Sequence, residues 1–206
     1  MKFPSKRYTT SYEFMKDYFK EYSRASKTVD QESIESVASI FKETMKAQGV
    51  IYFCGNGHSA AISSAFESDY VKCIRSNTSM MPNIRSLASN SSLITCLAND
   101  ISYDEIFAYQ IESMARQGDI LVTISSSGNS ENVVRAAKAA KEKGITCISM
   151  TGFDGGRTSE ICDINVHVQS QNYGVIEDLH QSILHAVGQF LRQEEFSDEE
   201  IQSIYL

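Results

Sequence analysis

Two strongly apolar stretches of five residues, each followed by a loop rich in glycine and serine and then by a helical stretch, constrain this chain most. The first run is Val50–Cys54, and the second is Ile120–Ile124. A continuous apolar run of this length is typical of a strand that is buried on both faces of a parallel sheet. The pattern therefore predicts an α/β fold, in which strands alternate with helices that cover both faces.

The rest of the chain continues this alternation. Two helices are expected first, at about residues 11–24 and 31–48, and Gly49 ends the second. Further strands are expected near residues 84–87, 145–150 and 164–168. Further helices are expected from the first loop to about residue 73 and at about 103–116, 131–143 and 176–192. Residues 93–97 could open another element, and the tail could hold a short last helix.

We expect one domain of 206 residues, because this length matches about one domain by the usual size range. Only two prolines occur, and no linker, low-complexity run or repeat divides the chain. The expected parts are N-terminal helices at about 8–48, an α/β core at about 50–192 and an acidic tail at 193–206.

Charge and hydropathy exclude several classes of protein. The net charge is −7, so no direct nucleic-acid partner is expected, because such binding depends on lysine and arginine against phosphates. No apolar run approaches the roughly 18–20 residues of a membrane span, and the first residues lack the apolar core of a signal peptide. No membrane partner is expected.

The cysteines indicate a reducing compartment. Their number is odd and they are scattered without a Cys-x-x-Cys pair, at positions 54, 73, 96, 147 and 162. Reduced thiols in a cytoplasmic protein are the expected state.

The two loops after the apolar runs, Gly55–Ser59 and Ser125–Ser130, carry the residues that point to chemistry. Ligands of a parallel sheet bind outside the carboxyl ends of its strands, so both loops should lie on one edge. Each precedes a helix, whose first N–H groups and partial positive charge suit an anion. Serine, glycine and asparagine are also ordinary turn and N-cap residues. Two such loops on one edge nevertheless favour an anion site.

Neither loop belongs to the common nucleotide-binding patterns. No Gly-Lys-Ser/Thr follows, as a Walker A loop requires, and neither loop fits Gly-x-Gly-x-x-Gly. A phosphate would be held by hydroxyls and backbone N–H groups rather than by a basic surface.

Four segments together resemble the SIS (sugar isomerase) family and, within it, the phosphoheptose isomerase group: Cys54–Ala60, Ala98–Asp100, Gly118–Ser130 and Thr151–Gly156. The resemblance covers roughly residues 10 to 192. It implies a flavodoxin-like three-layer sandwich with a five-stranded parallel sheet. It also implies a homotetramer with sites at the subunit interfaces.

The resemblance also implies which residues bind a phosphorylated sugar. The expected phosphate contacts are hydroxyls of the two loops: Ser59, Ser125, Ser126, Ser127 and Ser130. Residues expected near the substrate are Asn56, Gly57, Asn99 and Asp100.

Acid–base groups lie on two predicted helices. Interconversion of an aldose and a ketose needs one group that removes a proton from carbon and another that moves a proton on oxygen. The last helix offers Glu177, His180 and His185 on one flank, and the helix after the first loop offers Asp69. Such a flank could also simply face solvent.

Only some of the site residues that the resemblance implies are present at the corresponding positions of this chain. His185 matches the catalytic histidine, Asp69 stands in place of the catalytic glutamate, and Glu177 stands in place of a glutamine. Ala65 replaces a histidine that, with those three positions, binds zinc in some members, and Gly174 replaces an aspartate. No cofactor is expected to be required, although Asp69, Glu177 and His185 could hold zinc with an open water position.

The resulting hypothesis is an isomerase that converts sedoheptulose 7-phosphate into a heptose 7-phosphate. Glu177 or Asp69 would take the carbon-bound proton, and His185 would move the oxygen proton. His58, which replaces a glycine of the family loop, is expected to face solvent. The alternative is a non-catalytic phosphosugar-binding SIS protein, either a sensor or a regulator of the kind that associates with the replication initiator DnaA.

Overall fold

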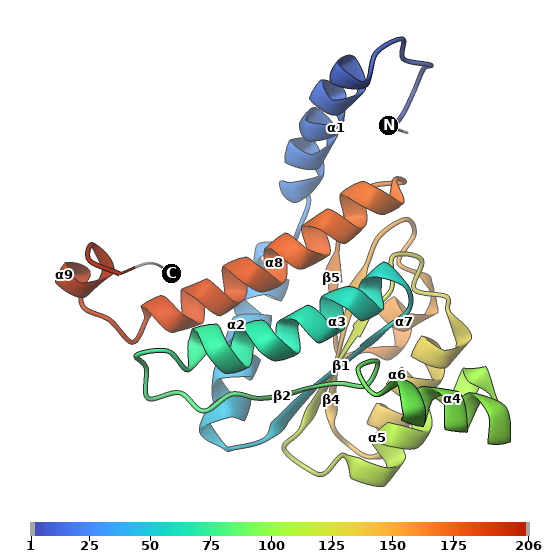
Figure 1. The fold of residues 1–206 in the computed structure, drawn as a ribbon, viewed down its shortest axis with the longest axis vertical. Coiled ribbons are helices and arrows are strands. Elements are labelled where there is room, and N and C mark those ends of the chain that lie inside the picture. The colour runs from blue at the N-terminus through green and yellow to red at the C-terminus, as the bar shows by residue number, and fades with distance from the viewer. Residues whose placement is uncertain (1–2, 205–206) are drawn as a thin grey trace.

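The computed structural model describes residues 3–204, and it contains a five-stranded sheet between two layers of helices (Figure 1). The strands are β1 (Val50–Gly55), β2 (Asn83–Ser86), β3 (Ile120–Ile124), β4 (Thr146–Thr151) and β5 (Ile164–His167). Their order is β2-β1-β3-β4-β5, and every neighbouring pair is parallel. The predicted α/β fold with a five-stranded parallel sheet is confirmed.

The α-helices are α1 (Ser11–Ser26), α2 (Gln31–Lys46), α3 (His58–Asp69), α4 (Ser91–Asp100), α5 (Ala108–Met114), α6 (Glu131–Glu142), α7 (Gly156–Ile161), α8 (Tyr173–Gln193) and α9 (Asp198–Ile201). A π-helical turn, η1 (Tyr70–Ile74), extends α3, and a 3-10 turn, η2 (Tyr103–Glu105), precedes α5. The helix predicted at 103–116 is thus divided, and α7 was not predicted. In the part of the chain described here, no helix is both long enough and apolar enough to cross a bilayer.

The alternation of side chains along the strands separates two cores. Residues 51, 53, 120, 122, 124, 148 and 150 face α2, α3 and α8, whereas residues 52, 54, 121 and 147 face α4, α5 and α6. This follows from the two-residue period of a strand. Because both faces are covered, the central strands β1 and β3 are almost entirely apolar, as the sequence indicated, and Thr123 is the polar residue of β3.

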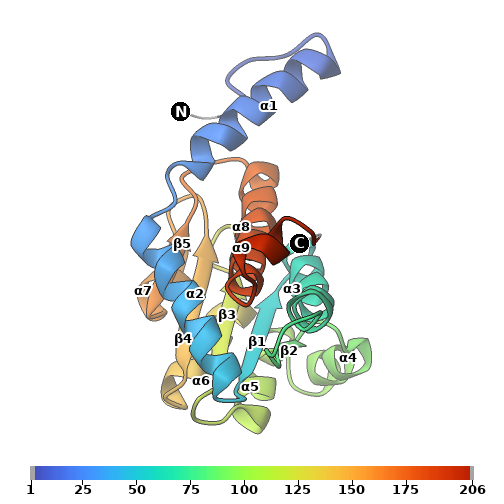
Figure 2. The ribbon, with the colours of Figure 1, turned by 90° about the vertical axis from the view of Figure 1, so that its left-hand side faces the viewer.

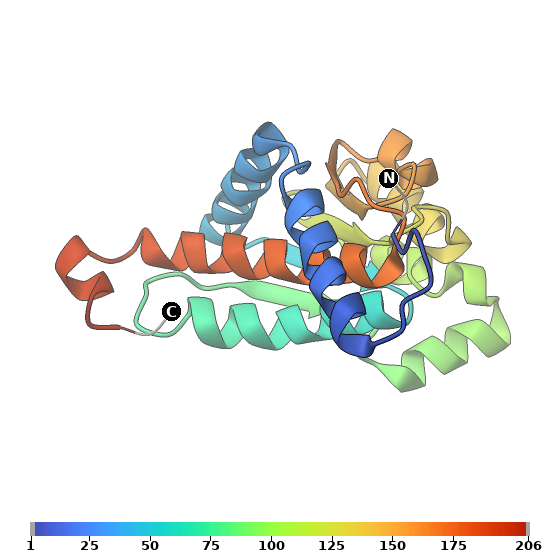
Figure 3. The same ribbon diagram turned by 90° about the horizontal axis from the view of Figure 1, so that it is seen from above.

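Helices α3 and α8 run side by side in the same direction over one face of the sheet, and α1 crosses α8 (Figure 3). Two tyrosine hydroxyls fasten α1 to α8: Tyr18 donates to Asp178 Oδ2 at 2.5 Å, and Tyr22 donates to Ser182 Oγ at 2.7 Å. The N-terminal half of α1 projects beyond the sheet and its covering helices (Figure 2).

The loop after β3 is locked to the segment between β4 and α7. Backbone N–H groups of Gly152 and Thr158 donate to Ser126 O at 2.9 Å and to Gly128 O at 3.0 Å. Gly128 has φ +63°, and a Cβ there would lie 2.0 Å from Gly155 O. This close approach between two backbones fixes the shape of the serine loop.

We predict that Gly128→Ala destabilises the protein far more than Gly144→Ala. Gly144 has nearly the same φ, +67°, but a Cβ there meets nothing within 4 Å. Gly144→Ala should therefore cost only the backbone strain, about 1 kcal/mol, whereas Gly128→Ala adds a backbone clash and should cost at least about 3 kcal/mol. Urea unfolding measures both, and equal losses would contradict the proposed lock.

Candidate functional site

The two serine loops leave neighbouring strands at the same edge of the sheet. Gly55 at the end of β1 pairs with Ile124 at the end of β3. The side-chain amides of Asn56 and Asn132 join the loops by exchanging two hydrogen bonds of 2.8 and 2.9 Å. The Tyr103 hydroxyl donates to Asn56 Oδ1 at 2.9 Å. The structure therefore brings the predicted loops together.

The two helices that follow these loops begin without a side-chain cap. The N-cap position of α3 is Gly57, and the hydroxyl of Ser130, the N-cap of α6, makes no capping bond within the described residues. The short helices α5 and α7 also begin without a side-chain cap, whereas α1, α2, α4 and α8 are capped by the side chains of Thr10, Asp30, Asn90 and Asn172. The N–H groups and partial positive charge of α3 and α6 are thus open to a ligand.

The serines of the second loop differ in what they contact. Ser125 and Ser126 are buried, and among residues 3–204 the Oγ of Ser126 has no hydrogen-bond partner. Ser127 Oγ accepts a bond of 3.3 Å from Asn129 N. A buried hydroxyl without a partner is costly, so Ser126 is suited to a ligand that supplies the partner. On the first loop, Ser59 is buried in the first turn of α3.

The structure places Asn99 and Asp100 on the exposed C-terminal end of α4. Asn99 Nδ2 donates to Asp100 Oδ1 at 2.7 Å. From this segment, Tyr103 is the residue that reaches the first loop. Sequence reasoning missed Tyr103 and Asn132. Asn132 lies two residues after the serine loop and could have been noticed, whereas Tyr103 carried no signal.

Asp69 and His185 form one pair across α3 and α8. His185 Nε2 lies 3.1 Å from Asp69 Oδ2, and both side chains are partly exposed. The His185 ring packs on Phe66, with centroids 4.9 Å apart. A carboxylate can only accept a hydrogen bond, so the Nε2–H of His185 donates, and Asp69 fixes the orientation of the ring.

Glu177 lies nearer the start of α8. Burial raises the pKa of Glu177 because it desolvates the carboxylate, and the charge of His58 partly opposes this shift. His58 itself is exposed at the start of α3, as expected. Eight residues separate Glu177 from His185, about 12 Å along the helix axis. Glu177 therefore lies near the start of α8, and His185 lies about two turns further along the helix, next to Asp69.

His180 does not share their surroundings. It is fully buried, and its Nε2–H donates to Thr151 O at 3.2 Å. Burial lowers the pKa of His180 to about 4, so the ring is neutral at pH 7. This histidine contributes to packing between α8 and the end of β4.

The residues present do not fit the zinc site that the resemblance implies. The methyl group of Ala65 cannot bind a metal, and the Asp69 carboxylate already accepts a bond from His185. Within residues 3–204, no three side chains of His, Cys, Asp or Glu lie close enough together to hold one ion.

We predict that Ser126→Ala leaves the stability of the free protein unchanged but weakens its affinity for inorganic phosphate. The Ser126 hydroxyl has no partner to lose. The control is Ser149→Ala, because Ser149 Oγ donates to Asn165 Oδ1 at 2.8 Å and its loss should cost about 1 kcal/mol. Thermal unfolding and calorimetric titration measure both properties. A destabilised Ser126→Ala variant with normal phosphate affinity would contradict the assignment.

Comparison with known proteins agrees with this geometry. The family model of the SIS domain matches residues 14–152. Phosphoheptose isomerase of Aliarcobacter butzleri (strain RM4018) is 35% identical over 182 residues, which cover 87% of this chain and 96% of the relative. Phosphoheptose isomerase of Clostridium acetobutylicum is 38% identical over 167 residues, which cover 81% and 85%.

Solved structures agree as well. Phosphoheptose isomerase GmhA from Neisseria gonorrhoeae has a TM-score of 0.80 at 30% identity and covers 88% of this chain and 98% of its own. A phosphoheptose isomerase from Francisella tularensis has a TM-score of 0.83 at 26% identity, with 90% and 100% covered. The chain belongs to the SIS domain family.

Proposed function

We propose that this protein is a sugar-phosphate isomerase that interconverts sedoheptulose 7-phosphate and an aldoheptose 7-phosphate. The observation that carries the proposal is that β1 and β3 end side by side, so that the two serine loops meet at one edge of the sheet. The starts of α3 and α6, which lack side-chain caps, and the partnerless Ser126 hydroxyl belong to this edge. Helices α3 and α8 carry the acid–base groups Asp69, Glu177 and His185 along their lengths. The curated relatives named phosphoheptose isomerase support the same activity.

The phosphate is bound by the two loops in this proposal. Ser59 and the serines of residues 125–130 supply hydroxyls, and the first turns of α3 and α6 supply N–H groups and partial positive charge. This arrangement suits an acidic protein, because it neutralises a dianion with local dipoles. The opposite end of the sugar then extends along α8.

The chemistry is two coupled proton transfers. Glu177 removes the proton from the carbon beside the carbonyl, and the electron pair moves to form an enediolate. The Nδ1 of His185, whose Nε2–H is bonded to Asp69, takes the proton of the neighbouring hydroxyl and passes it to the oxygen that gains this charge. Glu177 then returns its proton to the other carbon. The raised pKa of Glu177 suits a base that works near neutral pH.

Asp69 acts through His185 in this scheme. Its hydrogen bond of 3.1 Å selects the tautomer and holds the ring toward the substrate. We propose that no zinc is required. Support comes from Ala65 in place of a ligand histidine and from the engagement of Asp69 with His185.

We propose that the protein is cytoplasmic. The five cysteines are odd in number and scattered along the sequence without a Cys-x-x-Cys pair, which supports a reducing compartment.

We predict that Glu177→Gln lowers turnover at least about a hundredfold, since it removes the base, and that Asp69→Asn lowers turnover about tenfold or more through misorientation of His185. Incubation with sedoheptulose 7-phosphate in deuterated water, followed by NMR, measures exchange of the C1 and C2 protons. Asp178→Asn is the control, because Asp178 lies beside Glu177 on α8 but its carboxylate bonds Tyr18 of α1. Activity should fall as the pH drops through the pKa of Glu177, above the ordinary 4.5.

The outcomes of this experiment separate the alternatives. Exchange that is unaffected by a chelator and by added zinc supports the metal-free isomerase. Sugar-phosphate binding without exchange would instead favour the non-catalytic sensor, for which Ala65 and Gly174 already depart from the isomerase pattern. If the protein does not bind sugar phosphates at all, the remaining alternative is a regulator that acts through contacts with another protein.

We propose further that the protein is a homotetramer with its sites at subunit interfaces. The projecting half of α1 exposes Tyr12, Met15 and Phe19, at 66%, 45% and 59%. Their spacing of three and four residues places them on one helical face. A groove between α2 and α8 is also mostly apolar, lined by Val29, Ile34, Ala38, Leu179, Ile183 and Phe190. A second copy of the chain would cover these surfaces.

Light scattering should therefore give about four times the chain mass of 23.0 kDa. Phe19→Glu should produce smaller species without unfolding, because Phe19 is exposed within one chain. Met81→Glu is the control, since Met81 is equally exposed, at 59%, but lies far along the sequence in the loop before β2. A wild-type monomer at working concentration would contradict the assembly.

A further inference from the structure

A carboxylate stands in the first turn of α6, beside the proposed phosphate site. Glu131 directly follows Ser130, the N-cap of this helix. A negative charge here is favourable for the helix dipole. The same charge repels a phosphate dianion that approaches the same turn. Phosphate binding at this loop therefore depends on how Glu131 is neutralised.

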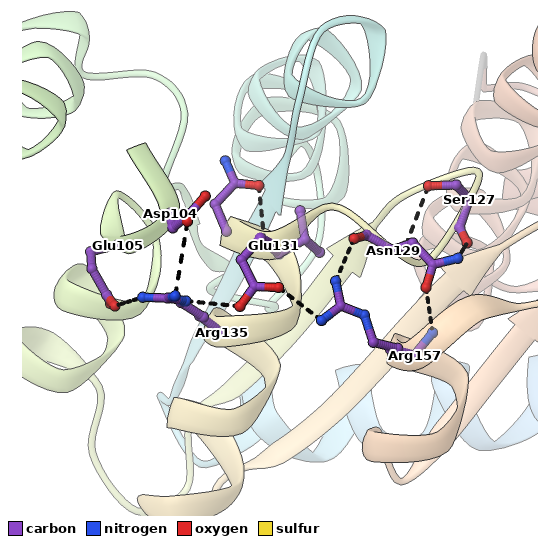
Figure 4. Close-up of polar contacts among 9 residues, drawn as sticks. Asp104, Glu105, Ser127, Asn129, Glu131, Arg135 and Arg157 are labelled. Carbon is purple, nitrogen blue, oxygen red and sulfur yellow. Dashed lines mark hydrogen bonds and ion pairs between the residues drawn. The ribbon is translucent and has the colours of Figure 1, made fainter. Parts of the chain in front are cut away.

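Two arginines hold Glu131 between them (Figure 4). Arg135 Nε donates to Oε1 at 2.9 Å, and Arg157 Nη1 donates to Oε2 at 2.8 Å. These bonds hold the pKa of Glu131 below its usual range, so it stays a carboxylate. All three side chains are partly exposed.

The two arginines differ in what else they bind. Arg135 turns away from the loop, to Glu105 and, at 3.9 Å, to Asp104. Arg157 turns toward the loop, where its Nη2 donates to Asn129 O at 2.6 Å. The charge of Arg135 is therefore shared among three carboxylates, and that of Arg157 serves Glu131 and the loop.

The backbone of Arg157 also contacts the middle of the second serine loop, residues Ser127–Asn129, which we call the crest. Its N–H donates to Asn129 Oδ1 at 3.2 Å, and Asn129 Nδ2 donates to Ser127 O at 3.0 Å. Figure 4 shows this path from Arg157 through Asn129 to Ser127. One residue of α7 thus contacts both the carboxylate and the crest.

We propose that Arg157 is a positioning residue for phosphate binding, which cancels the charge of Glu131 and holds the Ser127–Asn129 crest. This inference rests on the proposed function, because it concerns the same loop. Exposed ion pairs contribute little to stability, so the fold does not need the Arg157–Glu131 pair. Its effect is expected in affinity for the phosphate group.

The test compares Arg157→Gln, Arg157→Lys, Glu131→Gln and the double variant Glu131→Gln/Arg157→Gln. Arg157→Gln should raise both the KM for sedoheptulose 7-phosphate and the Kd for inorganic phosphate about tenfold, with kcat within about twofold. Removing the carboxylate as well should restore most of the affinity, because the backbone N–H of residue 157 still donates to Asn129 Oδ1 and holds the crest. Arg157→Lys should keep part of the affinity. The penalty should shrink in high salt. Lys141→Gln is the control, because Lys141 lies at the other end of α6 and forms an exposed ion pair with Asp163. This variant should leave the KM and the phosphate Kd unchanged.

Three results would overturn the proposal. These are normal phosphate affinity in Arg157→Gln, a double variant as weak as Arg157→Gln, and a wild-type protein that binds no inorganic phosphate. A wild type that binds phosphate but never turns over the sugar would defeat the proposed isomerase alone. The phosphate Kd series would then still decide the role of Arg157.

Discussion

The parallel pairing of β1 with β3 is the constraint on which the proposed site depends. Because Cys54 pairs with Thr123 and Gly55 with Ile124, both strands end at the same level. Two loops that are about 70 residues apart in the chain therefore meet at one edge. This placement brings the uncapped starts of α3 and α6 to the same edge, and it lets Asn56 and Asn132 exchange hydrogen bonds.

The second loop is shaped by what packs behind it rather than by its own residues. Gly128 and Gly156 both have positive φ, and each backbone approaches the other too closely for a Cβ. This contact places α7, and with it Arg157, against the loop crest. The segments that follow β3 and β4 pack on each other, so together they position both the phosphate-binding serines and the charged groups around Glu131.

Much of this fold could be predicted from local patterns. The apolar stretches predicted β1 and β3 nearly to the residue, because strands buried on both faces are mostly apolar, and Thr123 is the polar residue of β3. Helix α7 was missed, since it has only six residues and begins at two glycines with positive φ. The predicted helix at 103–116 is divided because residues 103–105 form a separate 3-10 turn, from which the Tyr103 hydroxyl reaches Asn56.

The candidate site could be predicted only in part for a related reason. The serine loops are contiguous in sequence and could be recognised as such. The pair of Asp69 and His185 joins residues 116 positions apart, so its hydrogen bond depends on how α3 packs along α8. The roles of Tyr103, Asn132 and Arg157 arise from contacts between elements, which no spacing within one element reveals.

The central claim is that the edge between β1 and β3 binds the phosphate of a sugar whose other end reaches the acid–base groups of α3 and α8. A crystal structure with bound sedoheptulose 7-phosphate tests this most directly. We predict that the phosphate lies between Ser59 and Ser126 and that the carbonyl end lies beside Glu177 and His185. A phosphate bound elsewhere, or a carbonyl end that points away from α8, would contradict the account.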